Sequence, residues 1–284
     1  MSYRRHIKRT QEVKTKPVHA LKLREFFSGV FNTIFLRNPV QRAIFSFFGK
    51  TFSRSNQHKM RLASYLAVAV ALILVLLASG GTKAAKFPVS SKNILAIPLI
   101  LSFFLLVGIR ILVNIPSSPE ANWIFRMTEV EAKKHYFSGF KKAIFFFALL
   151  PLFFALFVFY LFLWGWQNAL LHCLFGLALS TLLLELLFFK YPKIPFACTY
   201  LPGKGKIHIL WIVYVFAFLG YVSLMALIES NFFQRPSNFY YFYGAVLFIL
   251  LAIKIVNDYF LYRKLELVYE EKPEPVMVTL SQYT

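Results

Sequence analysis

Apolar residues along the chain gather into six runs that short polar segments separate. The runs cover residues 64–80, 94–115, 143–164, 167–189, 207–228 and 239–261. Their lengths lie near the roughly 20 residues that an α-helix needs to cross about 30 Å of hydrocarbon. The pattern therefore predicts an all-α fold, a polytopic integral membrane helical bundle with six transmembrane helices.

Before the first run, large apolar residues recur at helical spacing in a stretch too short to span a bilayer. These residues are Phe26, Phe27, Val30, Phe31, Ile34 and Phe35. A second amphipathic segment covers residues 39–52, where Pro39 suits the first turn of a helix. Flanking basic residues favour N-terminal helices that lie in the membrane interface. The alternative is a small cytoplasmic helical hairpin that packs on the rest of the protein.

These patterns divide the chain into four parts. Residues 1–25 form a basic cytoplasmic tail, and residues 26–63 hold the amphipathic interfacial helices. Residues 64–261 form the transmembrane domain, and residues 262–284 form a C-terminal tail. A further amphipathic helix is expected between the second and third runs, where Ser117 and Glu120 fit a capping box.

Composition supports a bilayer environment, since 58% of the 284 residues are hydrophobic and the mean hydropathy is +0.59. Lysine and arginine alternate strongly between the two sides of the predicted bundle. On one side, residues 1–63 contain fourteen lysines and arginines, residues 116–142 five, residues 190–206 four and residues 262–284 three. On the other side, residues 81–93 contain three, residues 165–166 none and residues 229–238 one. Basic residues concentrate in cytoplasmic loops, so we expect both termini in the cytoplasm and the protein in a bacterial-type inner (plasma) membrane.

This distribution also accounts for most of the net charge of +20. We therefore expect no nucleic-acid partner, although a basic chain can bind one. The expected partners are the lipid bilayer and its anionic lipids.

No motif in the chain identifies a cofactor or a catalytic site, and we expect no cofactor. Gly203, Lys204, Gly205 and Lys206 lack the spacing of a phosphate-binding loop. His172 and Cys173 are adjacent, so they do not share one face of a helix as two metal ligands. We expect no metal there, and we expect His172 to form a hydrogen bond with a neighbouring helix.

Four charged residues fall within the predicted spans. They are Arg110, Glu185, Lys254 and Asp258, all near the cytoplasmic ends. A charge at the centre of a bilayer costs at least about 2.5–3.5 kcal/mol, so such residues often mark a functional site. They are interpreted as an intramembrane polar cluster at the mouth of a pathway. The alternative is that the long side chains reach the headgroups separately, with Lys254 and Asp258 paired along one helix.

The order of elements resembles that of the ABC-2-type exporter permeases. In that family an amphipathic interface helix precedes six spans, and a cytoplasmic coupling helix lies between the second and third. Here residues 26–36, the six runs and residues 119–136 take those places. The segment 229–238 is too short for the re-entrant helices found in that family. The resemblance implies a separate partner ATPase, because this chain contains no ATP-binding motif.

Three functions follow from these observations. One is a membrane scaffold or assembly factor without catalysis. The second is a transport-associated permease subunit with ABC-2-like topology. The third is a membrane-embedded lipid-modifying enzyme, for which the chain shows no recognisable catalytic constellation.

The orientation can be tested at Cys198, which lies in the lysine-rich segment after the fourth run. In intact cells an impermeant maleimide should leave Cys198 unlabelled, because the charge distribution places it in the cytoplasm. Permeabilised cells serve as the control, in which Cys198 should react. Efficient labelling from outside would overturn the orientation.

Overall fold

The computed structural model describes residues 35–36, 38–79, 91–115, 133–189, 195–196 and 207–263. Within these residues the chain is helical and contains no strand. The helices are α3 (Pro39–Arg54), α4 (Asn56–Ser79), α5 (Lys92–Leu112), α7 (Lys133–Ile144), α8 (Leu150–Leu187), α9 (Ile207–Gln234) and α10 (Ser237–Arg263). A π-helix, η2 (Phe145–Leu149), joins α7 to α8. The predicted all-helical fold is confirmed for this part of the chain.

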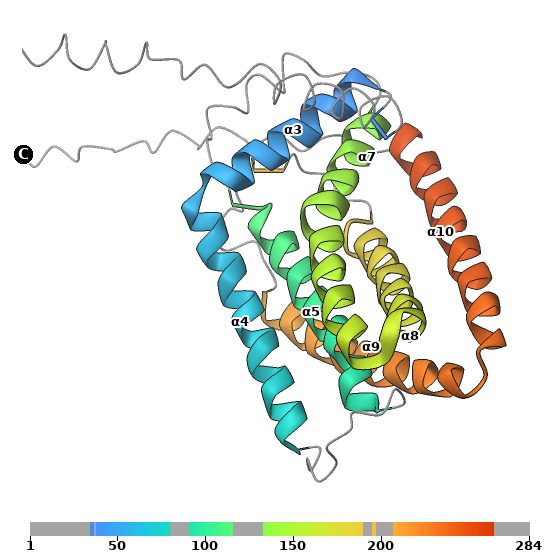
Figure 1. The fold of residues 1–284 in the computed structure, drawn as a ribbon. Helices are drawn as coiled ribbons and strands as arrows, with labels where there is room; N and C mark the ends of the chain where they lie inside the picture. The colour runs from blue at the N-terminus through green and yellow to red at the C-terminus, as the bar shows by residue number, and fades with distance from the viewer. Residues whose placement is uncertain are drawn as a thin grey trace, which may run out of the picture.

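Five helices in the described residues are long and apolar enough to cross a bilayer. They cover Asn56–Ser79, Lys92–Leu112, His135–Leu187, Val213–Gln234 and Ser237–Asn257. The third has 53 residues, about 80 Å of helix if it were straight. It is not straight, because the chain turns back within α8 (Figure 1).

The reversal in α8 occurs at Gly165, between Trp164 and Trp166. Gly165 has φ 76° and ψ 172°, which lies outside the helical region. Glycine reaches this backbone conformation because it has no Cβ atom. The break falls at the point where the sequence predicts a turn between the third and fourth apolar runs.

Helix α5 forms the centre of the bundle. It packs against α4, α8 and α9, and 78% of its most apolar stretch is buried, against 11–28% for the other spanning helices. The other helices therefore present most of their apolar surface outward, as expected when lipid tails are the solvent. Helix α9 crosses the lower part of the bundle obliquely, behind α5 and α8 (Figure 1).

Helix α3 lies along one end of the bundle, on the same side as the start of α7 and the end of α10 (Figure 1). The Asn38 side chain accepts a hydrogen bond from the amide of Val40 at 2.9 Å and caps the helix. The buried residues Gln41, Ile44 and Phe48 share one face, and α3 packs mainly on α7. Helix α3 begins at Pro39 and ends at Arg54, two residues beyond the segment expected from the sequence, and its place in the membrane interface stays a prediction.

Several expected features lie outside the described residues. They include the tail 1–25, the segment 26–34, residues 119–132 of the helix expected over 119–136, Cys198, the turn at 203–206 and residues 264–284. Phe35 is described and is 46% exposed. Its ring meets Phe146 edge to face with 5.3 Å between centroids, and its carbonyl accepts a hydrogen bond from Lys142.

The contact between α3 and α7 depends on Gly139. A Cβ atom at this position would lie 2.8 Å from the Cα atom of Gln41. We predict that Gly139→Ala lowers the free energy of unfolding by about 1–3 kcal/mol, because backbone cannot yield as a flexible side chain does. Thermal unfolding of the purified chain in detergent measures the effect. Gly220→Ala is the matched control, since a Cβ atom there meets no atom within 4 Å. Equal unfolding temperatures for the two variants would contradict the close approach.

Candidate functional site

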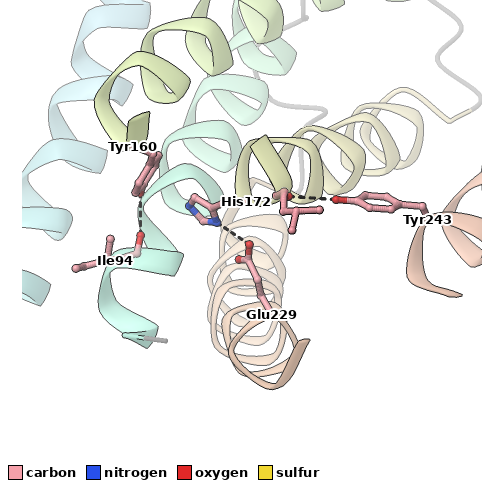
Figure 2. A network of polar contacts seen from close by, with 6 residues as sticks. Ile94, Tyr160, His172, Glu229 and Tyr243 are labelled. Carbon is pink, nitrogen blue, oxygen red and sulfur yellow. Dashed lines mark hydrogen bonds and ion pairs between the residues drawn. The ribbon is translucent and has the colours of Figure 1, made fainter. Parts of the chain in front are cut away.

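A histidine and a glutamate form a fully buried pair between α8 and α9. The Nδ1 atom of His172 lies 2.5 Å from Oε1 of Glu229, and both side chains have no exposed surface. Figure 2 shows the two side chains meeting between the helices, with the imidazole pointing at the carboxyl group. Such a pair inside an apolar bundle is the most unusual feature of the described structure, because buried ionisable groups in membranes are costly.

The fold brings these two residues together near the end of the bundle opposite α3. His172 follows the break at Gly165 by seven residues, so it lies about two turns into the returning half of α8. Glu229 lies five residues before the end of α9 at Gln234. Helices α8 and α9 both pack on α5. The pair therefore bridges two helices that share a common neighbour.

Aromatic rings enclose the imidazole. The rings of Tyr160 and His172 meet edge to face with centroids 4.4 Å apart, and Trp164 lies 5.3 Å from the imidazole. Tyr160 and Trp164 also stack on each other at 4.9 Å. These rings come from the half of α8 before Gly165. They hold the imidazole in place and separate it from solvent.

Two tyrosines tie the neighbouring helices to this region. The hydroxyl of Tyr160 donates a hydrogen bond to the carbonyl of Ile94 in α5 at 2.9 Å. The hydroxyl of Tyr243 in α10 donates to the carbonyl of Leu171, the residue before His172, at 3.1 Å. Figure 2 shows both bonds flanking the pair. Polar contacts from four helices thus converge near His172.

The short distance between Nδ1 and Oε1 requires one proton between the two atoms. Either the imidazole N–H donates to the carboxylate, or the protonated carboxyl donates to the unprotonated nitrogen. Within the described part of the chain, His172 Nε2 and Glu229 Oε2 have no hydrogen-bond partner. Each residue therefore keeps one polar atom that the pair does not use, so the unit is able to accept a second bond or to pass a proton.

The expectation that His172 bonds to a neighbouring helix is confirmed, but the sequence did not reveal its partner. The fifth span was predicted to end at residue 228, which left Glu229 in a loop. In the structure α9 continues to Gln234. Two phenylalanines beyond the glutamate, Phe232 and Phe233, extend the apolar pattern. These two residues could have indicated, from the sequence alone, that Glu229 lies inside the helix.

The charged residues expected to form a polar cluster lie at the other end of the bundle. Thirteen residues of α8 separate His172 from Glu185, a distance of about 20 Å along the helix. Glu185 pairs with Lys141 of α7 at 2.5 Å and accepts a hydrogen bond from Asn257 of α10 at 3.4 Å. The cationic partner of Glu185 thus comes from a segment that the sequence assigned to a loop.

The structure places two of the other members of the expected cluster. The guanidinium of Arg110 lies 5.2 Å from the centre of the Phe188 ring, and the Lys254 side chain is exposed on α10. The side chain of Asp258 lies outside the described part. A shared site of Arg110, Glu185, Lys254 and Asp258 therefore stays a prediction.

The described residues contain no group of three or more histidine, cysteine, aspartate or glutamate side chains able to hold a metal ion. Cys173, next to His172, is a buried free thiol.

Comparison with known proteins provides no further guide to the site. No protein-family model matches the chain, and neither the curated proteins nor the solved structures contain a significant match.

The bridge between α8 and α9 can be tested by a double-mutant cycle. Either His172→Phe or Glu229→Leu alone should destabilise the protein by about 3–5 kcal/mol, because each leaves a buried polar partner uncompensated. The double variant should lose less than the sum of the two. Unfolding of the full chain in detergent measures all three.

The matched control combines His172→Phe with Glu185→Gln at the other end of α8. These two changes should add, since no contact joins the two sites. Additive effects in the His172 and Glu229 cycle would show that the two residues do not stabilise each other.

Proposed function

We propose that this protein is a transport-associated membrane subunit in which His172 and Glu229 control the contact between α8 and α9. The supporting observation is the complete burial of this pair among aromatic rings. Apolar residues of similar size often hold helices together as well as a buried ion pair does, or better. A contribution to stability therefore does not explain why His172 and Glu229 are present at this position. Ionisable groups inside membranes commonly line pathways or relay protons.

A change in protonation provides a way to open this contact. The single proton between Nδ1 and Oε1 holds the two side chains together. If the shared proton leaves, the hydrogen bond is lost, and if a further proton binds at Nε2 or Oε2, the net charge of the buried pair changes. Aromatic contacts between α8 and α9 remain in both cases, such as that of Phe175 with Phe232, whose centroids are 6.2 Å apart. Because α5 packs against both helices, it serves as the fixed element against which α9 shifts.

The arrangement around α3 supports the same proposal. In the ABC-2-type permeases that the sequence resembles, an amphipathic helix precedes the first span. The resemblance gives that place to residues 26–36, and α3 is the second amphipathic segment, which follows it. Only Ser55 separates α3 from α4, and α3 packs on α7 at one end of the bundle. In this proposal α3 lies in the membrane interface, and a partner ATPase docks at this end.

The proposal includes six membrane crossings. The break at Gly165 divides the 53-residue helix into two arms, each long enough to cross a bilayer. The excess of lysine and arginine places α3 and both termini on the cytoplasmic side of a bacterial-type inner membrane. The His172–Glu229 pair then lies toward the outer side.

A scaffold or assembly factor is the second candidate, and the sealed environment of the pair favours it. His172 Nε2 and Glu229 Oε2 are fully buried, so neither atom touches water in this conformation. The same burial argues against direct catalysis by this pair in a lipid-modifying enzyme, since a substrate has no access to either atom.

The apolar double variant separates these functions. His172→Phe combined with Glu229→Leu keeps the volume of the site and removes the protonation chemistry. In a transport subunit, affinity purification from native membranes should recover an ATPase with the wild-type chain. The double variant should retain that ATPase, but ATP hydrolysis by the complex should fall severalfold.

Glu185→Gln is the matched control, because it removes a carboxylate at the other end of α8 and should leave hydrolysis unchanged. A wild-type chain that recovers no ATPase supports the scaffold. Unchanged hydrolysis in the double variant would show that the pair has no part in transport.

A further inference from the structure

An apolar cavity lies beneath α3, about at the level where the first spanning helix begins. Its volume is about 160 Å³. Phe48 and Phe52 of α3 and Leu62 and Leu66 of α4 line one part of it. Phe147 of the π-helix and residues of α5 and α8 complete the wall. The cavity thus lies where the interfacial helix meets the bundle, and it shares no lining residue with the His172–Glu229 pair.

The lining determines what this cavity can hold. Every side chain that lines it is apolar, so a polar ligand or water finds no hydrogen-bond partner there. An apolar cavity of about 150 Å³ is known to stay dry and to accept a ligand of the size of benzene. The cavity is only partly enclosed, and in a bilayer the surrounding solvent is acyl chain. The end of an acyl chain is therefore the natural occupant.

The charges around the cavity select the headgroup. Residues 38–79 contain no aspartate or glutamate. They contain five basic residues: Arg42, Lys50, Arg54, Lys59 and Arg61. Lys59 precedes Leu62 by three residues and so lies on the same side of α4, one turn nearer the end of the bundle. Lys59 is exposed, which suits contact with a phosphate at the membrane surface.

We propose that this cavity is a binding site for an anionic phospholipid, with one acyl chain beneath Phe48 and Phe52 and the headgroup phosphate at Lys59. The bound chain fills the space that α3, α4 and α5 leave between them. The lipid therefore fixes the position of α3 on the bundle. This site is independent of the His172–Glu229 pair and of the transport proposal.

Photo-crosslinking of the full chain in vesicles tests the site. The probe is phosphatidylglycerol with a photoreactive diazirine near the end of one acyl chain. Mass spectrometry should find the label on peptides that contain Leu62, Leu66 and Phe147. Ala148→Phe fills the cavity and should remove this label, whereas Val70→Phe, at a position 48% exposed on α4, should retain it. Persistence of the label in Ala148→Phe would show that the lipid belongs to the general layer around the protein.

A second measurement uses the unmodified chain and so does not depend on a variant that folds. Phosphatidylcholine with the same diazirine should label these peptides severalfold less than phosphatidylglycerol. Lys59→Gln should remove this difference, and Lys254→Gln on α10 is the control that should preserve it. Equal labelling of the wild-type chain by both lipids would overturn the assignment of an anionic headgroup.

Discussion

Polar groups inside a lipid bilayer must find their partners within the protein, because lipid tails supply none. In this bundle the constraint is most severe at His172 and Glu229, which share one short hydrogen bond without any exposed surface. Removal of either residue should lower the stability of the protein, since an uncompensated buried charge costs several kcal/mol. In the function that we propose, the position of α9 relative to α8 is therefore coupled to the protonation of these two side chains.

The surrounding contacts make this coupling specific. Tyr160 bonds to the backbone of α5, and Tyr243 bonds to the backbone beside His172. Both tyrosine hydroxyls donate to backbone carbonyls and not to the side chains of His172 or Glu229. The rings of Tyr160 and Trp164 restrict the imidazole to one orientation. Movement of α9 away from α8 therefore requires the loss of the hydrogen bond between His172 and Glu229 and of aromatic contacts such as that of Phe175 with Phe232.

The two ends of the bundle have different chemistry. At one end, Lys141, Glu185 and Asn257 join α7, α8 and α10 through partly exposed contacts, and α3 covers an apolar cavity. At the other end, the buried pair lies among aromatic rings. Exposed ion pairs contribute little to stability, whereas a buried pair affects it strongly when one partner is removed. A protonation-controlled contact is therefore best placed at the buried end.

Hydrophobic runs predicted the helices well, because the cost of exposing polar groups to lipid acts on each segment separately. The second run, expected over 94–115, corresponds to Lys92–Leu112, and the expected turn between the third and fourth runs coincides with the break at Gly165. Charged residues caused the errors at the ends of helices. Lys141 and Lys142 were assigned to a loop, yet α7 begins at Lys133, and Glu229 ended the fifth run too early. Both errors hid an ion pair, because the partner of a charge depends on how helices pack and not on the local pattern.

The most direct measurement is NMR of the full chain in lipid vesicles, with nitrogen-labelled histidine. The chain has six histidines, and the signal of His172 is the one that disappears in His172→Phe. The account predicts that Glu229→Gln shifts the Nδ1 signal of His172, because that nitrogen shares its proton with the glutamate. Glu185→Gln should leave the signal in place. A His172 signal that is the same in the wild-type chain and in Glu229→Gln would contradict the central claim that these two residues hold α8 and α9 together inside the membrane.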